Sequence, residues 1–216
     1  MQELYIDSVN HRFSEREILS SVFLNCKIGE VVGVLGRNGS GKSTLLKIIF
    51  GAVKPHFKHL KLDGEIIQKG YLTNQIAYLP QGYFIPHYLK IKDLIDLYIG
   101  RFKEQILQID VFKDNLNGSI GNLSGGYRRL VETLLMMYSD ANYVLLDEPF
   151  SQLSPLVIEE IKVHIQLLKG EKGFIVTDHQ YSKILEVSSR VMLINNGCNY
   201  NINCEDDLRL YGYLPN

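Results

Sequence analysis

Apolar residues in this chain gather in short continuous runs and, between those runs, at helical spacing. The continuous runs predict buried strands, and they lie at residues 30–35, 76–79, 143–146, 174–177 and 191–194. Apolar residues three and four positions apart predict helices over 42–50, about 92–116, 128–138 and from 155 onward. Strands that alternate with helices predict an α/β fold with a largely parallel sheet.

Turn and cap residues add detail at three places. Ser154 followed by Pro155 is a typical helix start, with serine as the N-cap and proline at the first helical position. Asn196-Gly197, after the last strand run, predicts a hairpin turn. Residues 82–122 are predicted to form a mostly helical insertion, and the residues after His179 to form the final strands and one short helix.

Composition narrows the class of protein. The 216 residues are 45% apolar and 22% charged, which is ordinary for a globular chain, and 23 basic residues balance 24 acidic ones. Nucleic-acid binding through counterion release favours a basic excess, so no nucleic-acid partner is expected. No apolar run approaches a membrane span, the first residues lack a signal-peptide pattern, and three cysteines without CxxC spacing suit a reducing cytosol. We therefore expect a cytoplasmic location.

A glycine-rich loop follows the strand run at 30–35. It matches the pattern GxxxxGK followed by serine or threonine, and it opens the helix predicted over 42–50. Glycines allow backbone N–H groups to surround a polyphosphate, and the helix start adds unpaired donors and a partial positive charge. Lys42 is predicted to reach the β- and γ-phosphates, Ser43 to bind Mg²⁺, and Thr44 to help hold the α-phosphate. The alternative is a tight structural turn with an exposed lysine. The predicted phosphate-binding residues are Gly36, Asn38, Gly39, Ser40, Gly41, Lys42, Ser43 and Thr44.

A second chemical signal is the acid pair Asp147-Glu148, which ends the strand run at 143–146. A parallel strand that ends in two acids places them at the C-terminal edge of the sheet, where the glycine-rich loop also lies. Asp147 is predicted to hold Mg²⁺ through water, and Glu148 to orient or deprotonate an attacking water. Pro149 excludes helical geometry at Glu148. Without the phosphate loop, a solvated strand end explains these acids equally well.

Leu123-Ser124-Gly125-Gly126 narrows the class further. Together with residues 36–44 and Asp147-Glu148-Pro149, in this order and spacing, it resembles the nucleotide-binding domain of ABC-type ATPases over nearly the whole chain. The resemblance implies one domain over 1–216, with 1–81 and 123–216 as the nucleotide-binding core and 82–122 as a small helical subdomain. It implies a P-loop NTPase fold with a mostly parallel sheet and an antiparallel β portion near the N-terminus.

The same resemblance implies roles for three further residues. Gln81 resembles the glutamine that senses Mg²⁺ and links to the helical subdomain, with an exposed polar turn residue as the alternative. His179 resembles the switch histidine that contacts the γ-phosphate, although a lone histidine is more often structural. Phe13 resembles the aromatic that stacks on adenine; a core aromatic is the alternative, with Tyr5 as a less favoured substitute. The implied catalytic set is Glu148, His179, Lys42 and Gln81, and the implied metal set is Ser43, Gln81 and Asp147.

In the proteins that this chain resembles, the loop corresponding to Ser124-Gly125-Gly126 contacts the γ-phosphate of the opposite subunit. The resemblance therefore implies a head-to-tail homodimer or heterodimer with two ATP molecules at its interface. It also implies a membrane-embedded partner subunit, which would hold this chain at the inner face of the cell membrane. The aromatic-rich segment Tyr83, Phe84, Pro86 and Tyr88 is the expected docking face, and packing within the helical subdomain is the alternative.

Two positions depart from the family pattern. Tyr127 stands where the family usually has glutamine, and Ser154 stands where it usually has aspartate. Serine can cap the helix that Pro155 begins, but it supplies no negative charge. We therefore expect that the start of this helix still folds, and that communication between the two ATP sites of the dimer is weaker.

The implied function is an ATP-hydrolysing subunit that drives a separate membrane transporter. A soluble ABC ATPase of a non-transport process is the alternative, which co-purification with a soluble partner would favour. A weakly hydrolysing regulatory module is a second alternative, less favoured because Glu148 and His179 are both present. A P-loop kinase is disfavoured because the loop at 123–126 would then have no purpose.

Overall fold

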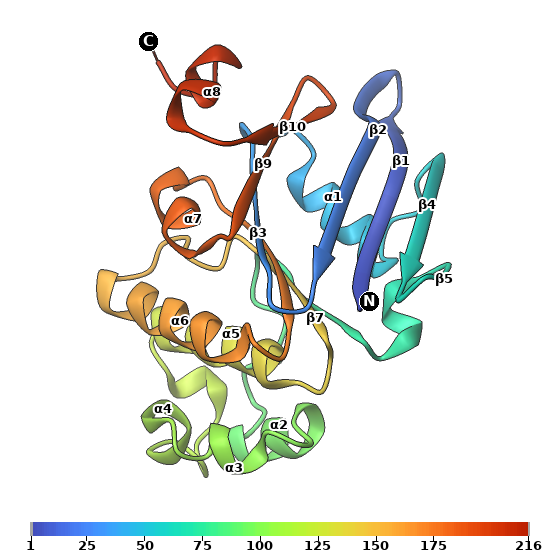
Figure 1. Ribbon diagram of the computed structural model, residues 1–216. Helices are drawn as coiled ribbons and strands as arrows, with labels where there is room; N and C mark the ends of the chain where they lie inside the picture. Colours follow the sequence, from blue (N-terminus) through green and yellow to red (C-terminus); the bar gives the residue numbers. More distant parts are fainter. Residues whose placement is uncertain (1, 216) are drawn as a thin grey trace.

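Two β-sheets form the framework of the protein in a computed structural model that describes residues 2–215 (Figure 1). The first sheet is antiparallel, in the order β2-β1-β4-β5. Its strands are β1 (Glu3–Phe13), β2 (Arg16–Lys27), β4 (Phe57–Leu62) and β5 (Glu65–Ile66). Along β1 and β2, buried residues such as Leu4, Ile6 and Leu24 alternate with more exposed ones, because successive side chains point to opposite faces.

The second sheet has the strand order β10-β9-β3-β8-β7-β6, and its strands are parallel except for β10. They are β3 (Val31–Leu35), β6 (Ile76–Leu79), β7 (Tyr143–Asp147), β8 (Gly173–Thr177), β9 (Arg190–Asn195) and β10 (Cys198–Ile202). Every residue of β3, β7 and β8 is buried, which explains their continuous apolar runs in the sequence. The carboxyl ends of these parallel strands meet at one edge of the sheet.

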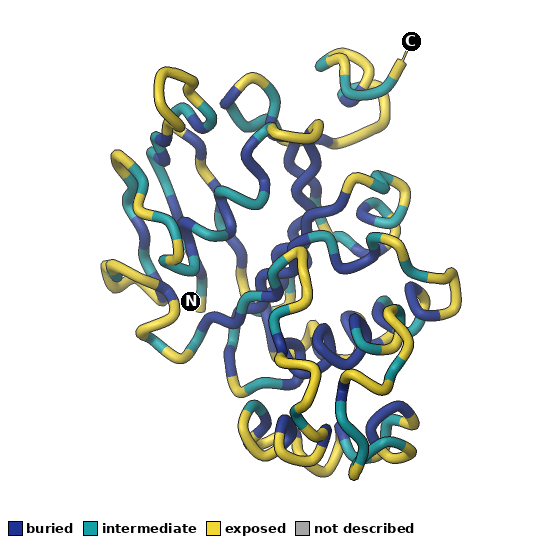
Figure 2. Tube along the Cα trace, turned by 180° about the vertical axis from the view of Figure 1, so that it is seen from behind, coloured by how far each residue is buried: buried dark blue, intermediate teal, exposed yellow. Residues whose placement is uncertain are grey.

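Helices and the antiparallel sheet cover the two faces of this sheet. On one face lie α5 (Gly125–Tyr138), α6 (Pro155–Leu168) and α7 (Tyr181–Val187), which share a core with Val31 and Leu35. On the other face, α1 (Lys42–Phe50) and the antiparallel sheet enclose Val32 and Val34. Figure 2 shows the resulting buried trace through the middle of the molecule. Shorter elements are α8 (Glu205–Leu210) and the 3₁₀ helices η1 (Gly70–Thr73) and η2 (Ile120–Asn122). Within residues 2–215, no helix combines the length and the apolarity that crossing a membrane requires.

The predicted fold class is confirmed. A mostly parallel sheet, an antiparallel sheet built largely from the first third of the chain, and the helix at 42–50 all appear in the structure. The hairpin predicted at Asn196-Gly197 also forms, between β9 and β10. Both turn residues have positive φ, 50° at Asn196 and 81° at Gly197, as the tight hairpin turn of this type requires.

Two predictions about helices are wrong. The pattern at about 92–116 predicts one helical stretch, whereas the structure has three short helices, α2 (Ile91–Tyr98), α3 (Lys103–Ile106) and α4 (Asp110–Lys113), at the bottom of Figure 1. Gly100 interrupts the stretch where the backbone passes close to Asp140, and the Arg101 N–H donates to Asp140 Oδ1 at 2.9 Å. The chain after His179 forms two short helices, α7 and α8, where one was predicted, and residues 82–90 form the loop that leads into α2.

The start of α6 partly matches its prediction. Ser154 occupies the N-cap position and Pro155 the first helical position, but the Ser154 side chain makes no capping hydrogen bond. The Ser154 carbonyl nevertheless accepts the N–H of Ile158 at 3.1 Å. The helix therefore begins where it was predicted because proline fixes a helical φ, and not because the serine hydroxyl caps it.

A buried lysine closes the end of α5. Lys172 is fully buried, and its ammonium group donates to the carbonyl of Ser139 at 2.6 Å and to that of Ala141. It also lies 4.9 Å from the ring centre of Phe102. Ser139 is the C-cap of α5, so the lysine satisfies a carbonyl that the helix leaves unpaired. Burial lowers the pKa of Lys172 to about 8, because the charged form loses its hydration.

Lys172→Met should therefore change how stability depends on pH. The ordinary pKa of lysine is 10.5, so between pH 8 and 10.5 the unfolded wild-type chain holds a proton that the folded chain has released. Relative to the variant, wild-type stability rises with pH across this window, by up to about 1.4 kcal/mol per pH unit. Urea unfolding of both proteins at about pH 7.5 and about pH 9.5 measures the difference. If the difference in the free energy of unfolding between wild type and Lys172→Met is the same at both pH values, the pKa of Lys172 is not lowered in the folded protein.

Candidate functional site

The glycine-rich loop joins the end of β3 to the start of α1. Gly41 is the N-cap of α1 and has a φ of 107°, a left-handed conformation that residues with a Cβ rarely adopt. A Cβ at this position would lie 2.7 Å from Leu19 Cδ2 and 2.9 Å from Ile18 Cγ2, so only glycine fits without a shift. The first N–H groups of α1 have no acceptor inside the helix. Together with the positive end of the helix dipole, they favour an anion at the loop.

Lys42 lies against this loop. It is only 4% exposed, and its Nζ donates to the carbonyl oxygens of Gly36 at 2.7 Å and Arg37 at 3.3 Å. Burial lowers the pKa of Lys42, while nearby carboxylates, chiefly Glu148, oppose the shift. Ser40 Oγ is buried in the same loop without a hydrogen-bond partner among residues 2–215. Lys42 is therefore not the exposed lysine that a merely structural turn would carry.

Asp147 ends β7 next to the loop and is fully buried. Its Oδ1 accepts hydrogen bonds from Ser43 Oγ at 2.8 Å and Thr177 Oγ1 at 2.9 Å, and its Oδ2 accepts one from the Tyr78 hydroxyl at 3.0 Å. Burial and the nearby Asp147 raise the pKa of Tyr78, so this phenol keeps the proton that it donates. Hydroxyl and carboxylate oxygens are ligands that Mg²⁺ prefers, so the adjacent Ser43 and Asp147 side chains fit a magnesium ion.

Glu148 has a backbone conformation that is unusual for its residue type. Its φ is 51°, in the left-handed region, whereas Pro149 was expected only to exclude the right-handed helical one. Its Oε2 accepts hydrogen bonds from Gln81 Nε2 at 2.9 Å and Ser151 Oγ at 3.0 Å, and His179 Nδ1 lies 3.6 Å away. Backbone strain of this kind costs about 1–3 kcal/mol and is typical of functional sites.

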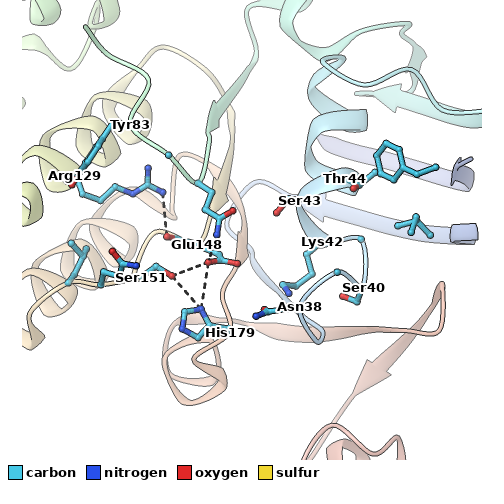
Figure 3. A pocket seen from close by; sticks show the side chains of 18 of the residues that line it. Asn38, Ser40, Lys42, Ser43, Thr44, Tyr83, Arg129, Glu148, Ser151 and His179 are labelled. Carbon is cyan, nitrogen blue, oxygen red and sulfur yellow. Dashed lines mark hydrogen bonds and ion pairs between the residues drawn. The ribbon is translucent and has the colours of Figure 1, made fainter. Parts of the chain in front are cut away.

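Lys42, Ser43, Gln81, Glu148, Ser151 and His179 line one cleft of about 1100 Å³ (Figure 3). Asn38, Ser40 and Lys42 lie on one wall, Tyr83 and Arg129 lie on the opposite wall, and Glu148 lies between them. The structure therefore brings most of the predicted site residues together around one cavity. Those that line it are Phe13, Asn38, Gly39, Ser40, Gly41, Lys42, Ser43, Thr44, Gln81, Gly125, Gly126, Glu148 and His179.

Three predicted site residues, Gly36, Asp147 and Ser124, are not part of this lining. Gly36 lies where β3 passes into the loop, and Asp147 is buried beside Ser43. Ser124 is exposed at the N-cap of α5, where its Oγ accepts the N–H of Tyr127 at 3.4 Å. This bond holds the exposed Ser124 side chain at the start of α5.

Phe13 lies at the end of β1 and is 54% exposed. Its ring meets that of His11 edge-on, with the ring centres 4.7 Å apart, and it borders the cleft. The alternative of a core aromatic is therefore wrong. Tyr5, the less favoured substitute, does not border the cleft.

Three residues that shape the site were not predicted from the sequence. Arg129 is 4% exposed and donates to the carbonyls of Pro80 at 2.7 Å and Asp147 at 2.9 Å, while Tyr78 and Thr177 hold the Asp147 carboxylate. The position of Thr177 at a strand end, directly before Asp178-His179, is a signal that could have revealed it. Arg129 and Tyr78 lie within apolar patterns and carry no such signal.

A buried strand, a glycine loop with a lysine, a helix start and a carboxylate at the end of a nearby strand define a P-loop nucleotide-binding protein. A family model described as "ABC transporter" matches residues 19–151. The chain therefore belongs to the ABC transporter family, in which it is an ATP-binding protein and an ATPase.

Two relatives align with most of the chain. The lipopolysaccharide export system ATP-binding protein LptB of Haemophilus influenzae is 30% identical, over 91% of this chain and 88% of that protein. The probable sulfate/thiosulfate import ATP-binding protein CysA of Chlorella vulgaris is 29% identical, over 90% of this chain and 88% of that protein. A solved ATP-binding subunit of an ABC transporter has a TM-score of 0.83 at 21% identity, covering 97% of this chain and 93% of that chain. This structural likeness shows the fold.

Arg129→Met should destabilise the protein by about 2–4 kcal/mol, because the buried carbonyls of Pro80 and Asp147 lose their donor. Urea unfolding measures the change. The control is Arg209→Met on α8, where the arginine is exposed and pairs with Asp206 at 2.8 Å. The control should shift stability by less than about 0.5 kcal/mol. Equal effects of the two substitutions would mean that Arg129 does not hold these strand ends.

Proposed function

We propose that this chain is the ATP-hydrolysing subunit of an ABC transporter, and that it dimerises around two ATP molecules to drive a separate membrane subunit. One observation carries the proposal: Glu148, bonded to Gln81 and Ser151 and close to His179, shares a cleft with the phosphate loop. Membership of the ABC transporter family supports the same function.

The phosphate loop and the first turn of α1 bind the polyphosphate of ATP. Lys42 exchanges its bonds to the loop carbonyls for the β- and γ-phosphates, which offer charge as well as acceptor oxygens. The buried Ser40 hydroxyl, which has no partner within residues 2–215, supplies a further donor, and Thr44 contributes at the α-phosphate. Phe13 presents its exposed ring at the border of the same cleft, where it stacks on adenine.

Ser43 and Asp147 are the residues that hold Mg²⁺ in this proposal. Their oxygens are already 2.8 Å apart, and hydrogen bonds from Thr177 and Tyr78 orient the carboxylate. Gln81, whose amide donates to Glu148, the residue after Asp147, is the third metal residue of this proposal. Bound Mg²⁺ neutralises charge that develops on the transferring phosphoryl group.

Glu148 orients the attacking water and takes its proton. Within residues 2–215, the hydrogen bonds to its carboxylate all end on Oε2, which leaves Oε1 for the water. His179 reaches the γ-phosphate from the end of β8. The buried Asp178 fixes this turn, because it accepts the N–H groups of Phe150 at 3.1 Å and Gln180 at 2.9 Å.

The Ser124-Gly125-Gly126 loop completes the site of a second copy. Ser124 is exposed at the N-cap of α5, and its hydroxyl can still donate while its oxygen accepts the Tyr127 N–H. Within residues 2–215 the N–H groups of Gly125 and Gly126 have no acceptor, so they can meet a phosphate from outside the chain. Homodimers and heterodimers both satisfy this arrangement. Each of the two ATP molecules then lies between the phosphate loop of one subunit and this loop of the other.

The docking face for the membrane subunit lies in the segment after Gln81. Tyr83 and Tyr88 are 53% and 69% exposed, and Pro86 is exposed between them, which suits an apolar partner helix. Phe84 is half-buried and packs edge-on against Tyr98, with the ring centres 6.4 Å apart. Phe84 therefore serves the packing of the helical subdomain. Through this partner the chain is held at the cytoplasmic face of the cell membrane.

Glu148→Gln should abolish ATP turnover and leave MgATP binding intact, because the amide keeps the shape of the side chain but cannot accept the proton. The expected loss in kcat is at least about 100-fold, with the dissociation constant within about twofold. Phosphate release from MgATP without an added acceptor measures turnover, and calorimetry measures binding. Glu159→Gln, at an exposed acid on α6 that pairs with Lys162, is the control and should match wild type. Wild-type turnover in Glu148→Gln would show that this carboxylate is not the base.

Ser154→Asp should raise both the ATPase rate and its Hill coefficient, because it supplies the charge that the family usually has at this position. Ser154 makes no side-chain cap bond, so the substitution removes no existing interaction of α6. Ser154→Asn is the matched control, with nearly the same size as aspartate and no charge. An unchanged ATPase rate and Hill coefficient in Ser154→Asp would count against communication between the two ATP sites through this position. Equal changes of both quantities in Ser154→Asp and Ser154→Asn would count against it as well.

A further inference from the structure

Tyr83 links two loops of the cleft that come from different segments of the chain. It lies two residues after Gln81, and its hydroxyl donates to the carbonyl oxygen of Gly125 at 3.0 Å. Gly125 is the first residue of α5 and belongs to the Ser124-Gly125-Gly126 loop. Tyr83 lies next to Arg129 on the wall opposite the phosphate loop (Figure 3).

The Tyr83 ring and the residues after it are themselves held against α5. The guanidinium carbon of Arg128 lies 4.3 Å from the centre of the Tyr83 ring, and Arg128 Nη2 donates to the carbonyl of Ile85 at 2.7 Å. The fully buried Glu132 accepts the Ile85 N–H at 3.3 Å and lies 3.5 Å from Arg128 Nε. The segment from Tyr83 to Ile85 is therefore attached to the first two turns of α5 at several points.

The hydrogen bond to Gly125 fixes the direction of the next N–H group. The Gly125 carbonyl and the Gly126 N–H belong to one peptide group, which is planar and has its two polar bonds pointing in opposite directions. A donor that holds the carbonyl therefore also aims the N–H. Gly126 borders the cleft, and its N–H is one of the unpaired donors at the start of α5.

We propose that Tyr83 is a positioning residue that aims the Gly126 N–H at the phosphate of the second subunit and couples that aim to Gln81 in its own subunit. This inference rests on the proposed function. Tyr83 touches no phosphate in this arrangement; it acts through the peptide group that it holds. Glu148 bonds to Gln81, and Tyr83, two residues further along the chain, bonds to Gly125. A shift of Glu148 can therefore be transmitted through residues 81–83 to the peptide group between Gly125 and Gly126.

Tyr83→Phe keeps the ring over Arg128 and removes only the hydroxyl, so it tests the positioning role directly. The expected result is a kcat about threefold to tenfold lower, the usual effect of losing one neutral hydrogen bond in a transition state. Binding of MgATP to the monomer should not change, because the phosphate loop is untouched. In a Glu148→Gln background, which stops turnover, Tyr83→Phe should weaken ATP-dependent dimerisation, as followed by light scattering.

The matched control is Tyr71→Phe, which removes the hydroxyl of another partly exposed tyrosine; among the described residues this hydroxyl bonds only to Lys69. It should retain wild-type kcat and dimerisation. Wild-type kcat and dimerisation in Tyr83→Phe would overturn the inference and leave the proposed function standing. If the wild-type protein neither binds MgATP nor releases phosphate, the proposed function itself fails, and the two failures are thus distinguishable.

A second pair of variants tests the contact independently of turnover. A Cβ added at Gly125 would lie 2.9 Å from the Tyr83 hydroxyl, so Gly125→Ala should lower the melting temperature. Tyr83→Phe removes the oxygen that the new Cβ would crowd. Gly125→Ala should therefore lower the melting temperature less in the Tyr83→Phe background than in wild type. Additive shifts in melting temperature would mean that the hydroxyl does not contact Gly125 in solution.

Discussion

The hydrogen bonds of the buried Asp147 carboxylate fix the geometry on which the rest of the site depends. They join three elements that come from distant parts of the chain, through Ser43 on α1, Thr177 on β8 and Tyr78 on β6. Asp147 and Thr177 pair in register at the ends of parallel strands, so the carboxylate meets the hydroxyl without any adjustment of a loop. A buried carboxylate is costly unless its oxygens accept hydrogen bonds, and each donor therefore constrains the position of the others.

Hydrogen bonds to the main chain hold the strained backbone at Glu148 in place. The Glu148 N–H donates to the Thr177 carbonyl at 2.9 Å, and Arg129 donates to the carbonyls of Asp147 at 2.9 Å and Glu148 at 3.4 Å. A positive φ at a residue other than glycine persists only where its surroundings determine it fully. Arg129 thus links the first turns of α5 to the strand end that carries both acids, and the side of the cleft formed by α5 cannot shift independently of Glu148.

The sequence predicted what depends on local pattern and missed what depends on contact in space. Strands buried on both faces, such as β3, β7 and β8, leave continuous apolar runs, and the glycine loop and acid pair lie next to them as short motifs. The break at Gly100 depends on Asp140, which lies far away in the sequence, so no local pattern indicates it. Tyr78 lies in an apolar strand and Arg129 in an amphipathic helix, and the roles of both follow only from the strands that they meet. The catalytic roles of Glu148, Lys42, Gln81 and His179 stay predictions.

The helices α1 and α5 of the site differ from α8 in how the partial positive charge at the helix start is balanced. The first turn of α8 carries three acidic residues, which oppose the helix dipole, and one of them, Asp207, accepts the N–H groups of Asn203 and Cys204. By contrast, α1 and α5 have no acidic residue in that turn. At α1, Lys42 adds a full positive charge. At α5, the arginines of the first turns, Arg128 and Arg129, are engaged with carbonyls of the protein, so only Ser124 and the backbone N–H groups remain. Such a start can orient a phosphate but carries no full charge to neutralise it. It therefore suits the proposed dimer, in which the lysine of the other subunit balances the charge of the phosphate.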